Sequence, residues 1–222
     1  MHDKRMGTAG FFADKPTIAG GRVLLRSFRA GDIDAMGVIL ADPEVLILTG
    51  SVYTTREAHG RTAVLDSATR RWYETRAEQP DRLDLAIIDQ ASSTCVGEVV
   101  LNELSPDNES CSFRILIGPA GRDRGLGTEA TRLIIQHAFR TTTLHRIELE
   151  VFAFNPRAQH VYEHSGFTFE GKRRDAHKFD GDYIDALTMS ILRSENQADI
   201  PDSKSRAQDR TKGPRNYPHG NP

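Results

Sequence analysis

The stretch FRILIGPAGRDRGLGTEATRLIIQHAF, residues 113–139, decides the fold of this chain. It opens with an aliphatic run, residues 113–118, that has the β-branched content of a buried strand. Residues 119–128 then form a turn with charged side chains and the glycines Gly125 and Gly127. From there apolar residues recur at three- and four-residue spacing, which is typical of a half-buried helix. The stretch therefore predicts a strand, a loop and a helix.

The loop between this strand and this helix has the features of an anion-binding site. Amide N–H groups in the first turn of a helix have no intrahelical partner, and the helix dipole adds partial positive charge there. Gly125 and Gly127 let the backbone close around an anion. Arg122 and Arg124 are placed to add positive charge. We expect a phosphate or pyrophosphate ligand at this loop.

One class of ligand that fits such a loop is a dinucleotide. Residues 125–130, GLGTEA, match the pattern G-x-G-x-x-A, and Glu148 or Glu150 would then be the ribose-binding acid. In the dinucleotide fold, however, the first glycine follows its strand almost directly, whereas six residues separate Gly118 from Gly125. About half of the chain also precedes the unit that usually opens such a domain. A nicotinamide-dependent oxidoreductase is therefore the minority alternative.

Two segments together resemble the GNAT acetyltransferase superfamily. Residues 122–127, RDRGLG, are similar to its R/Q-x-x-G-x-G/A signature, whose loop binds the pyrophosphate of acetyl-CoA. Residues 155–167, NPRAQHVYEHSGF, are similar to its N-x-x-A-x-x-x-Y-x-x-x-G-F segment. The resemblance covers about residues 22–192. It is nearest to the ribosomal-protein N-terminal acetyltransferases, although several of these have serine where this chain has Ala158.

The resemblance implies acetyl-CoA as co-substrate. Its pyrophosphate would bind to the loop of residues 119–128, called the glycine loop below, and its pantetheine would lie along the backbone of the preceding strand. The backbone of that strand would also polarise the thioester carbonyl. The next helix cap would add a further contact. The residues expected to bind the cofactor are Ile115, Leu116, Ile117, Arg122, Asp123, Arg124, Gly125, Leu126, Gly127, Thr128 and Asn155.

Two side chains are candidates for proton transfer. Tyr162 matches the tyrosine that many family members place beside the cofactor sulfur as general acid, a role that suits a phenol with a reference pKa of about 10. The alternative is a half-buried helix tyrosine with one hydrogen bond. Glu98 shares a strand face with Val100 and Asn102, where family members often place a base. The alternative for Glu98 is a structural pair with an arginine such as Arg114.

These residues predict an acetyl-CoA-dependent N-acetyltransferase that acts on a primary amine of a small molecule or a protein N-terminus. Direct transfer in a ternary complex is expected, because neither Cys95 nor Cys111 lies in a recognisable nucleophile setting. The acceptor pocket is expected to come from the helices after Asp32 and from the hairpin around Asp180 and Gly181. The non-enzymatic alternative is a module of the same fold that binds acyl-CoA as a sensor or docking domain.

The predicted fold class is α/β (α+β). Short turns between the apolar runs at residues 83–88, 95–104 and 111–118 indicate an antiparallel meander, and the helix after them suits a crossover to a parallel strand. We expect a mixed, mostly antiparallel sheet of about seven strands with helices on both faces. The resemblance adds a splayed central parallel pair. A long polar helix is expected from residue 54 to residue 79.

Composition sets the domain bounds and the expected partners. Residues 1–20 read as a loose arm, residues 21–193 as the acetyltransferase domain, and residues 194–222 as a disordered polar tail. The net charge of −2 without a dense basic block excludes nucleic acid as the expected partner, and no apolar run is long enough to span a membrane. No signal peptide is visible, so the expected location is the cytoplasm. No metal is expected, and homodimerisation would follow the family habit.

Overall fold

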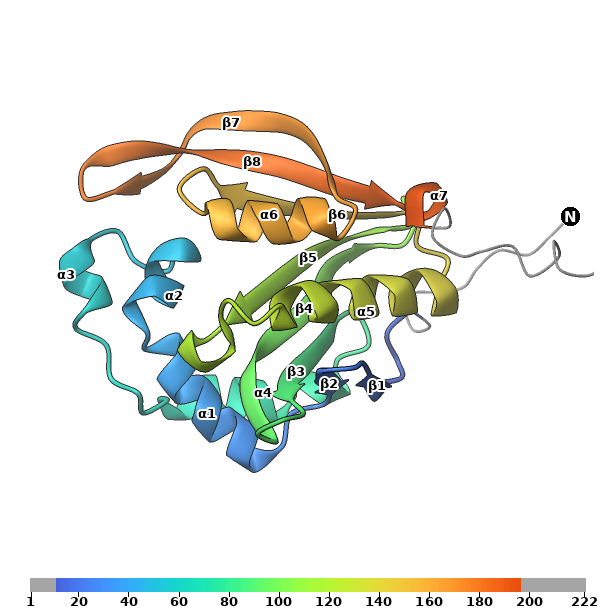
Figure 1. Ribbon diagram of the computed structural model, residues 1–222, viewed down its shortest axis with the longest axis horizontal. Coiled ribbons are helices and arrows are strands. Elements are labelled where there is room, and N and C mark those ends of the chain that lie inside the picture. Colours follow the sequence, from blue (N-terminus) through green and yellow to red (C-terminus); the bar gives the residue numbers. More distant parts are fainter. Residues whose placement is uncertain (1–10, 197–222) are drawn as a thin grey trace, which may run out of the picture.

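The computed structural model describes residues 11–196 and contains an eight-stranded sheet (Figure 1). The strands are β1 (Ile18–Ala19), β2 (Val23–Arg26), β3 (Leu83–Asp89), β4 (Thr94–Ser105), β5 (Ser110–Ile117), β6 (Arg146–Phe152), β7 (Thr168–Phe179) and β8 (Asp182–Leu192). The helices are α1 (Ala30–Leu40), α2 (Pro43–Leu48), α3 (Thr55–Ala58), α4 (Ser67–Glu74), α5 (Leu126–Thr141), α6 (Pro156–His164) and α7 (Arg193–Asn196). Two short 3-10 helices are η2 (Arg76–Glu78) and η3 (Pro119–Gly121).

The strand order across the sheet is β1-β2-β3-β4-β5-β6-β8-β7. Every neighbouring pair is antiparallel except β5 and β6, which α5 connects in parallel. The predicted fold class is confirmed. The sheet has eight strands where about seven were expected, because Ile18 and Ala19 pair with β2. The dinucleotide alternative is wrong, since that fold is built on a mostly parallel sheet.

The two faces of β5 serve different layers, because successive side chains point to opposite sides of a strand. Phe113 packs into the larger core together with Ile134 of α5 and Tyr162 of α6. Leu116 faces the other way and packs against a second core that includes Met36 of α1 and Tyr73 of α4. Helices therefore cover both faces, as expected, and each large apolar side chain buried there contributes roughly 1.5–3 kcal/mol.

The segment before β2 is ordered by the sheet. Phe12 is buried in the larger core, and the Nζ atom of Lys15 donates to the carbonyl oxygens of Phe12, Gln79 and Arg82 at 2.7, 2.6 and 2.5 Å. Residues 11–20 are therefore not the loose arm that was expected. Residues 1–10 and the polar tail from residue 197 onward lie outside the described residues.

The long helix expected from residue 54 to residue 79 is instead three short pieces, α3, α4 and η2. Gly60 follows the C-cap of α3 and ends that helix. Asp66 then starts α4 anew, because its side chain accepts the Thr69 N–H at 2.7 Å. The result is a broken cover over the second core, which leaves room for a cavity between α2 and α4.

Candidate functional site

The parallel ladder between β5 and β6 breaks early. Residues 110–112 pair with residues 146–148, and no further pair joins the two strands. From Phe113 to Ile117, β4 is the only strand of the described residues that pairs with β5. The predicted splay of the parallel pair is therefore present, and it opens a gap in the middle of the sheet.

The backbone of β5 presents free polar groups to this gap. Gly118 N–H donates to the carbonyl of Val96 at 2.8 Å, which fixes the alternation along the antiparallel β4–β5 ladder. Backbone groups of Leu116 then point toward β4, and those of Ile115 and Ile117 point toward the gap. Of the three residues expected along pantetheine, Ile115 and Ile117 have suitable backbone groups. Leu116 is available only through its side chain.

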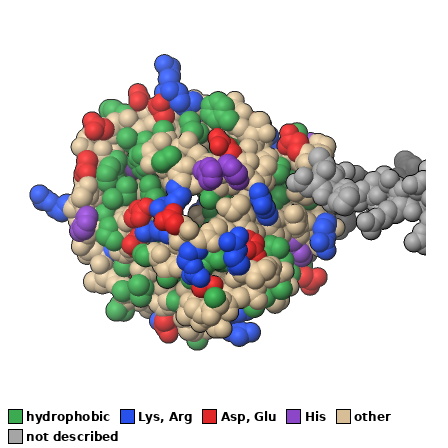
Figure 2. Space-filling view, viewed as in Figure 1, with side chains coloured by type: hydrophobic (Ala, Val, Ile, Leu, Met, Phe, Trp, Pro, Cys, Tyr) green, Lys and Arg blue, Asp and Glu red, His purple; other side chains and the backbone are tan. Residues whose placement is uncertain are grey.

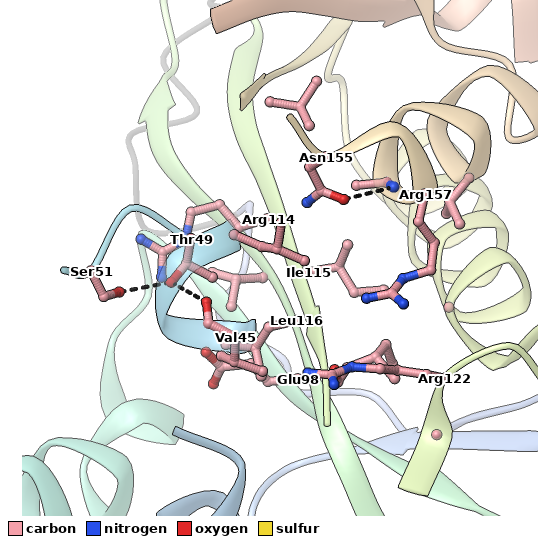
Figure 3. A pocket seen from close by; sticks show the side chains of 18 of the residues that line it. Val45, Thr49, Ser51, Glu98, Arg114, Ile115, Leu116, Arg122, Asn155 and Arg157 are labelled. Carbon is pink, nitrogen blue, oxygen red and sulfur yellow. Dashed lines mark hydrogen bonds between the residues drawn. The ribbon is translucent and has the colours of Figure 1, made fainter. Parts of the chain in front are cut away.

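A cavity of about 910 Å³ opens at the gap. Figure 2 shows a hollow on one face of the molecule beside acidic and basic side chains, and Figure 3 shows part of the lining. Most of the predicted site residues line this cavity: Glu98, Ile115, Leu116, Ile117, Arg122, Asp123, Gly125, Gly127, Thr128, Asn155 and Tyr162. The structure thus brings together residues from β4, β5, the glycine loop and α6.

The glycine loop meets the cavity with the first turn of α5. Gly125 is the N-cap residue with a φ of 71°, a left-handed conformation that favours glycine, and no side chain caps the helix. Gly127 and Thr128, in that first turn, line the cavity. A Cβ atom on Gly127 would lie 3.5 Å from Ile117, an ordinary contact. Uncapped amides at a helix start that faces a cavity are suited to a phosphate.

Arg122 lines the cavity, but its charge is already compensated. Its guanidinium binds Glu44 at 2.5 Å and also contacts Asp42, while its Nε atom donates to the carbonyl of Ile117 at 3.3 Å. Glu44 contacts Arg157 of α6 as well. The expectation that Arg122 adds free positive charge at the loop is therefore wrong for this arrangement. Its charge instead joins α2, β5 and the loop.

Two of the expected cofactor-binding side chains lie outside the cavity lining. Arg124 donates to Asp89 at 2.9 Å and to the carbonyl of Ala120 at 3.0 Å, and its hydrogen bond is the main reason that the pKa of Asp89 is lowered. Leu126 is buried in the larger core. Arg124 therefore stabilises the glycine loop by binding it to the end of β3, and Leu126 packs α5 against the larger core.

Asn155 caps a helix and also lines the cavity, so its position is compatible with both roles expected of it. Its Oδ1 atom accepts the Ala158 N–H at 3.1 Å, and Pro156 occupies the first turn of α6. Figure 3 shows this bond at the upper end of the cavity, next to Arg157. The predicted cap is confirmed, and the cofactor contact stays a prediction.

Tyr162 is held by aromatic packing at the wall of the cavity. Its ring lies 6.0 Å from that of Phe113 and 5.9 Å from that of Phe167. Burial raises the pKa of the phenol above its ordinary value, so the hydroxyl stays protonated at neutral pH. Within residues 11–196 no hydrogen bond contributes to this shift, and Tyr162 is part of the cavity lining. The arrangement leaves the proton free for a ligand.

Glu98 is a buried carboxyl at the floor of the cavity. Only 3% of it is exposed, and burial raises its pKa to about 7, with a smaller contribution from the charge of Asp84. The Tyr73 hydroxyl and the charge of Arg114 act in the opposite direction. Its Oε2 atom has no partner among the described residues, and no ion pair joins it to Arg114. The structural-pair interpretation is therefore wrong, and a group that titrates near neutrality lies beside the cavity.

Several lining residues carry no motif in the sequence. Thr49 and Ser51 follow α2, and Trp72 and Tyr73 belong to α4. The sequence indicates these residues only through the general expectation that the helices after Asp32 form part of the acceptor pocket. The Asp180–Gly181 hairpin, expected in the same pocket, is not in the described lining, because Asp180 accepts the Thr55 N–H at 2.9 Å and docks the hairpin tip on α3.

The remaining candidate groups do not form a second centre. The rings of His160 and His164 lie 3.8 Å apart, and the described part of the chain contains no cluster of three or more His, Cys, Asp or Glu residues that could hold a metal ion. Burial raises the pKa of both the Cys95 and Cys111 thiols to about 12, so neither is a thiolate at neutral pH. No helix in residues 11–196 is long and apolar enough to cross a membrane.

Comparison with known proteins identifies the family to which this chain belongs. The sequence profile of the acetyltransferase (GNAT) domain matches residues 22–168, more than half of the chain. A spermidine N(1)-acetyltransferase of Vibrio cholerae is 32% identical over 49% of this chain and 62% of its own length. A putative ribosomal N-acetyltransferase of Bacillus subtilis is 29% identical over 45% of this chain and 54% of its own length. The chain thus spans less than two thirds of either relative.

The fold comparison agrees. A crystal structure of spermidine N-acetyltransferase from Vibrio cholerae, in complex with CoA and spermine, superposes with a TM-score of 0.67. The superposition covers 80% of this chain and 99% of that one at 22% sequence identity. At that identity the similarity establishes the fold alone. The broken β5–β6 ladder is an observation on this chain.

Proposed function

Because this chain belongs to the GNAT acetyltransferase family, we propose that it transfers an acetyl group from acetyl-CoA to a primary amine of a small molecule or peptide. The transfer is direct, within a ternary complex. The observation that carries this proposal is the open edge of β5, where free backbone groups of Ile115 and Ile117 meet the uncapped first turn of α5 in one cavity. The relatives named above act on amines, which supports the reaction class.

The residues present fit acetyl-CoA. Amides of Gly127 and Thr128 would hold the pyrophosphate, aided by the helix dipole. Backbone groups of Ile115 and Ile117 would pair with the amide groups of pantetheine, as a strand would. Asn155 and Tyr162 lie where the thioester end of such an extended ligand would reach the wall formed by α6.

The two proton-transfer residues lie on opposite faces of the sheet. Glu98 pairs in register with Leu116, so its side chain shares the face of β5 that is turned toward α1 and α4. Tyr162 packs on Phe113, whose side chain is on the other face. The amine therefore arrives from the α2–α4 side, the thiol leaves on the α6 side, and the gap beside β5 connects the two.

The chemistry assigns one proton to each side. Glu98 accepts a proton from the ammonium form of the acceptor, directly or through one water, which leaves a nucleophilic lone pair. The amine nitrogen bonds to the thioester carbonyl carbon, and a backbone N–H at the open edge of β5 stabilises the resulting oxyanion. The C–S bond then breaks, the Tyr162 hydroxyl protonates the departing thiolate, and the second proton of the attacking nitrogen is released to water, from which the phenolate regains its proton. Neither cysteine is used, in agreement with their raised pKa values.

Replacing Tyr162 with Phe tests this assignment. We expect turnover of acetyl-CoA with an amine to fall by about 100-fold or more, because a positioned acid contributes roughly 10²–10⁴-fold, while acetyl-CoA affinity measured by calorimetry changes little. Tyr183→Phe is the matched control, since Tyr183 is exposed on β8. Full turnover in Tyr162→Phe would exclude Tyr162 as the acid, and no acetyl-CoA binding by the parent protein would refute the proposed function.

A further inference from the structure

One charged side chain in the cavity has no role in the reaction as described. Arg114 lies on β5, in register with Val100 of β4, and lines the cavity on the face of the sheet that also carries Glu98. Figure 3 shows it extending from β5 toward Thr49 and Ser51, whereas Asn155 and Arg157 lie on the other side of the strand. Arg114 therefore occupies the acceptor side of the cavity.

Arg114 differs from the other arginines of the lining because it lacks a carboxylate. Arg122 and Arg157 are paired with Glu44. Within the described residues, the guanidinium of Arg114 makes neither an ion pair nor a hydrogen bond, and its side chain is exposed to the cavity opening. A planar fork of donors beside a substrate pocket is suited to a carboxylate, which it can bind through two parallel hydrogen bonds.

The acidic side chains of the lining do not favour a polycation. The only three among the described residues are Glu98, Asp123 and Glu150. Glu98 is buried at the floor, where one amine suffices to meet it, and Glu150 contacts Arg173. Asp123 belongs to the glycine loop at the cofactor end. A polyamine would thus be repelled by the positive charge of Arg114, and the lining of the described residues offers few unpaired carboxylates to compensate the polyamine's own charges.

The spacing of Glu98 and Arg114 is compatible with one small molecule that bears both charges. They are diagonal neighbours on adjacent strands, a relation that places the two residues roughly 7–8 Å apart, with their Cβ atoms somewhat closer. The charge of Arg114 also contributes to lowering the pKa of Glu98, in agreement with their position on one face of the sheet. Leu46, Leu48 and Phe152 add apolar walls around them.

From this arrangement we propose that the acceptor is an amine that carries a carboxylate, of the amino-acid or short-peptide class, and that Arg114 binds this carboxylate. The inference rests on the proposed function and narrows its substrate class. Arg114 is then a specificity-determining residue: it selects an anionic acceptor and rejects polyamines, while Glu98 faces the reacting nitrogen.

The test compares leucine with leucinamide, in which a neutral amide replaces the carboxylate, together with spermidine and an aminoalkyl phosphate. CoA release is followed with each amine for the parent protein and for Arg114→Gln. We expect the leucine-to-leucinamide ratio of kcat/KM to be about 10- to 100-fold higher for the parent than for Arg114→Gln, which is the worth of a charge-assisted hydrogen bond. The difference in basicity between the two amines is the same for both proteins and cancels in this comparison. Arg140→Gln, on the exposed end of α5 and outside the cavity lining, keeps the parent ratio.

Each other outcome has a distinct meaning. Higher kcat/KM with spermidine than with leucine, or an unchanged leucine preference in Arg114→Gln, overturns the inference and leaves the proposed function intact. Preference for the aminoalkyl phosphate assigns Arg114 to a phosphate and overturns the carboxylate. No CoA release with any amine refutes the proposed function itself. Acetyl-CoA affinity, measured for every variant, shows that Arg114→Gln is folded.

Discussion

The buried carboxyl of Glu98 predicts an unusual dependence of stability on pH. In the folded protein its pKa is about 7, whereas the ordinary value is 4.5. Between these two pH values the folded protein holds a proton that the unfolded chain has released, so unfolding releases a proton. The free energy of unfolding contributed by this group is therefore full below pH 4.5, falls as pH rises through that interval, and is flat above about 7.

The magnitude follows from the size of the shift. One pKa unit corresponds to about 1.4 kcal/mol, so the interval from 4.5 to about 7 represents about 3 kcal/mol. Glu98→Gln keeps the shape of the side chain and removes the titration. Relative to the parent protein, Glu98→Gln should gain about 3 kcal/mol in free energy of unfolding between acidic and mildly alkaline pH. Other titrating groups are common to both proteins and cancel in this difference.

Urea denaturation of both proteins at several pH values between 4.5 and 8.5 measures this difference. Tyr73→Phe provides an internal check, because loss of the hydroxyl that lowers the pKa of Glu98 should move the midpoint of the parent's transition to higher pH. The same variant series links stability to function: Glu98→Gln should lose turnover while it gains stability at alkaline pH. A difference in free energy that does not vary with pH would refute the burial argument and remove Glu98 as a base that titrates near neutrality.

Two further predictions concern the scaffold of the site. Gly125→Ala should lower the free energy of unfolding by about 1–2 kcal/mol, because Gly125 has a φ of 71°. Gly127→Ala should be neutral or stabilising, because Gly127 is helical and an added Cβ atom would make only an ordinary contact. Thermal denaturation of the two variants measures this difference, and equal losses of stability would contradict it. Lys15→Met should cost about 1–3 kcal/mol in urea denaturation, because three backbone carbonyls lose their donor, and a loss no larger than that of the exposed control Lys178→Met would show that the clamp is not stabilising.

The sequence predicts the parts of this molecule that depend on local rules. The strand–loop–helix at residues 113–139 is confirmed because alternation, helical periodicity and glycine conformation act within a few residues. The cap at Asn155 is confirmed for the same reason. The family signatures then locate Tyr162 and the glycine loop at one cavity.

The sequence fails where a side chain's role depends on a distant partner. Arg122 was expected to be free for a ligand, but Asp42 and Glu44, some eighty residues earlier, bind it. Asp89 holds Arg124 in the same way. Arg114, which has no ion-pair partner in residues 11–196, has no motif that would distinguish it from the arginines that are paired. Only the folded arrangement shows which charges are compensated.

The short β5–β6 ladder also makes the sheet two half-sheets joined by three residue pairs. The amide protons of Ile115 and Ile117, which point into the gap, are exposed to exchange with deuterium from the solvent until a ligand covers them. Their exchange rates should therefore report occupancy of the gap residue by residue, even in variants without turnover. A ligand that spans the gap also couples the two half-sheets, so it should slow exchange in β6 and β8 as well, at amides that it does not touch.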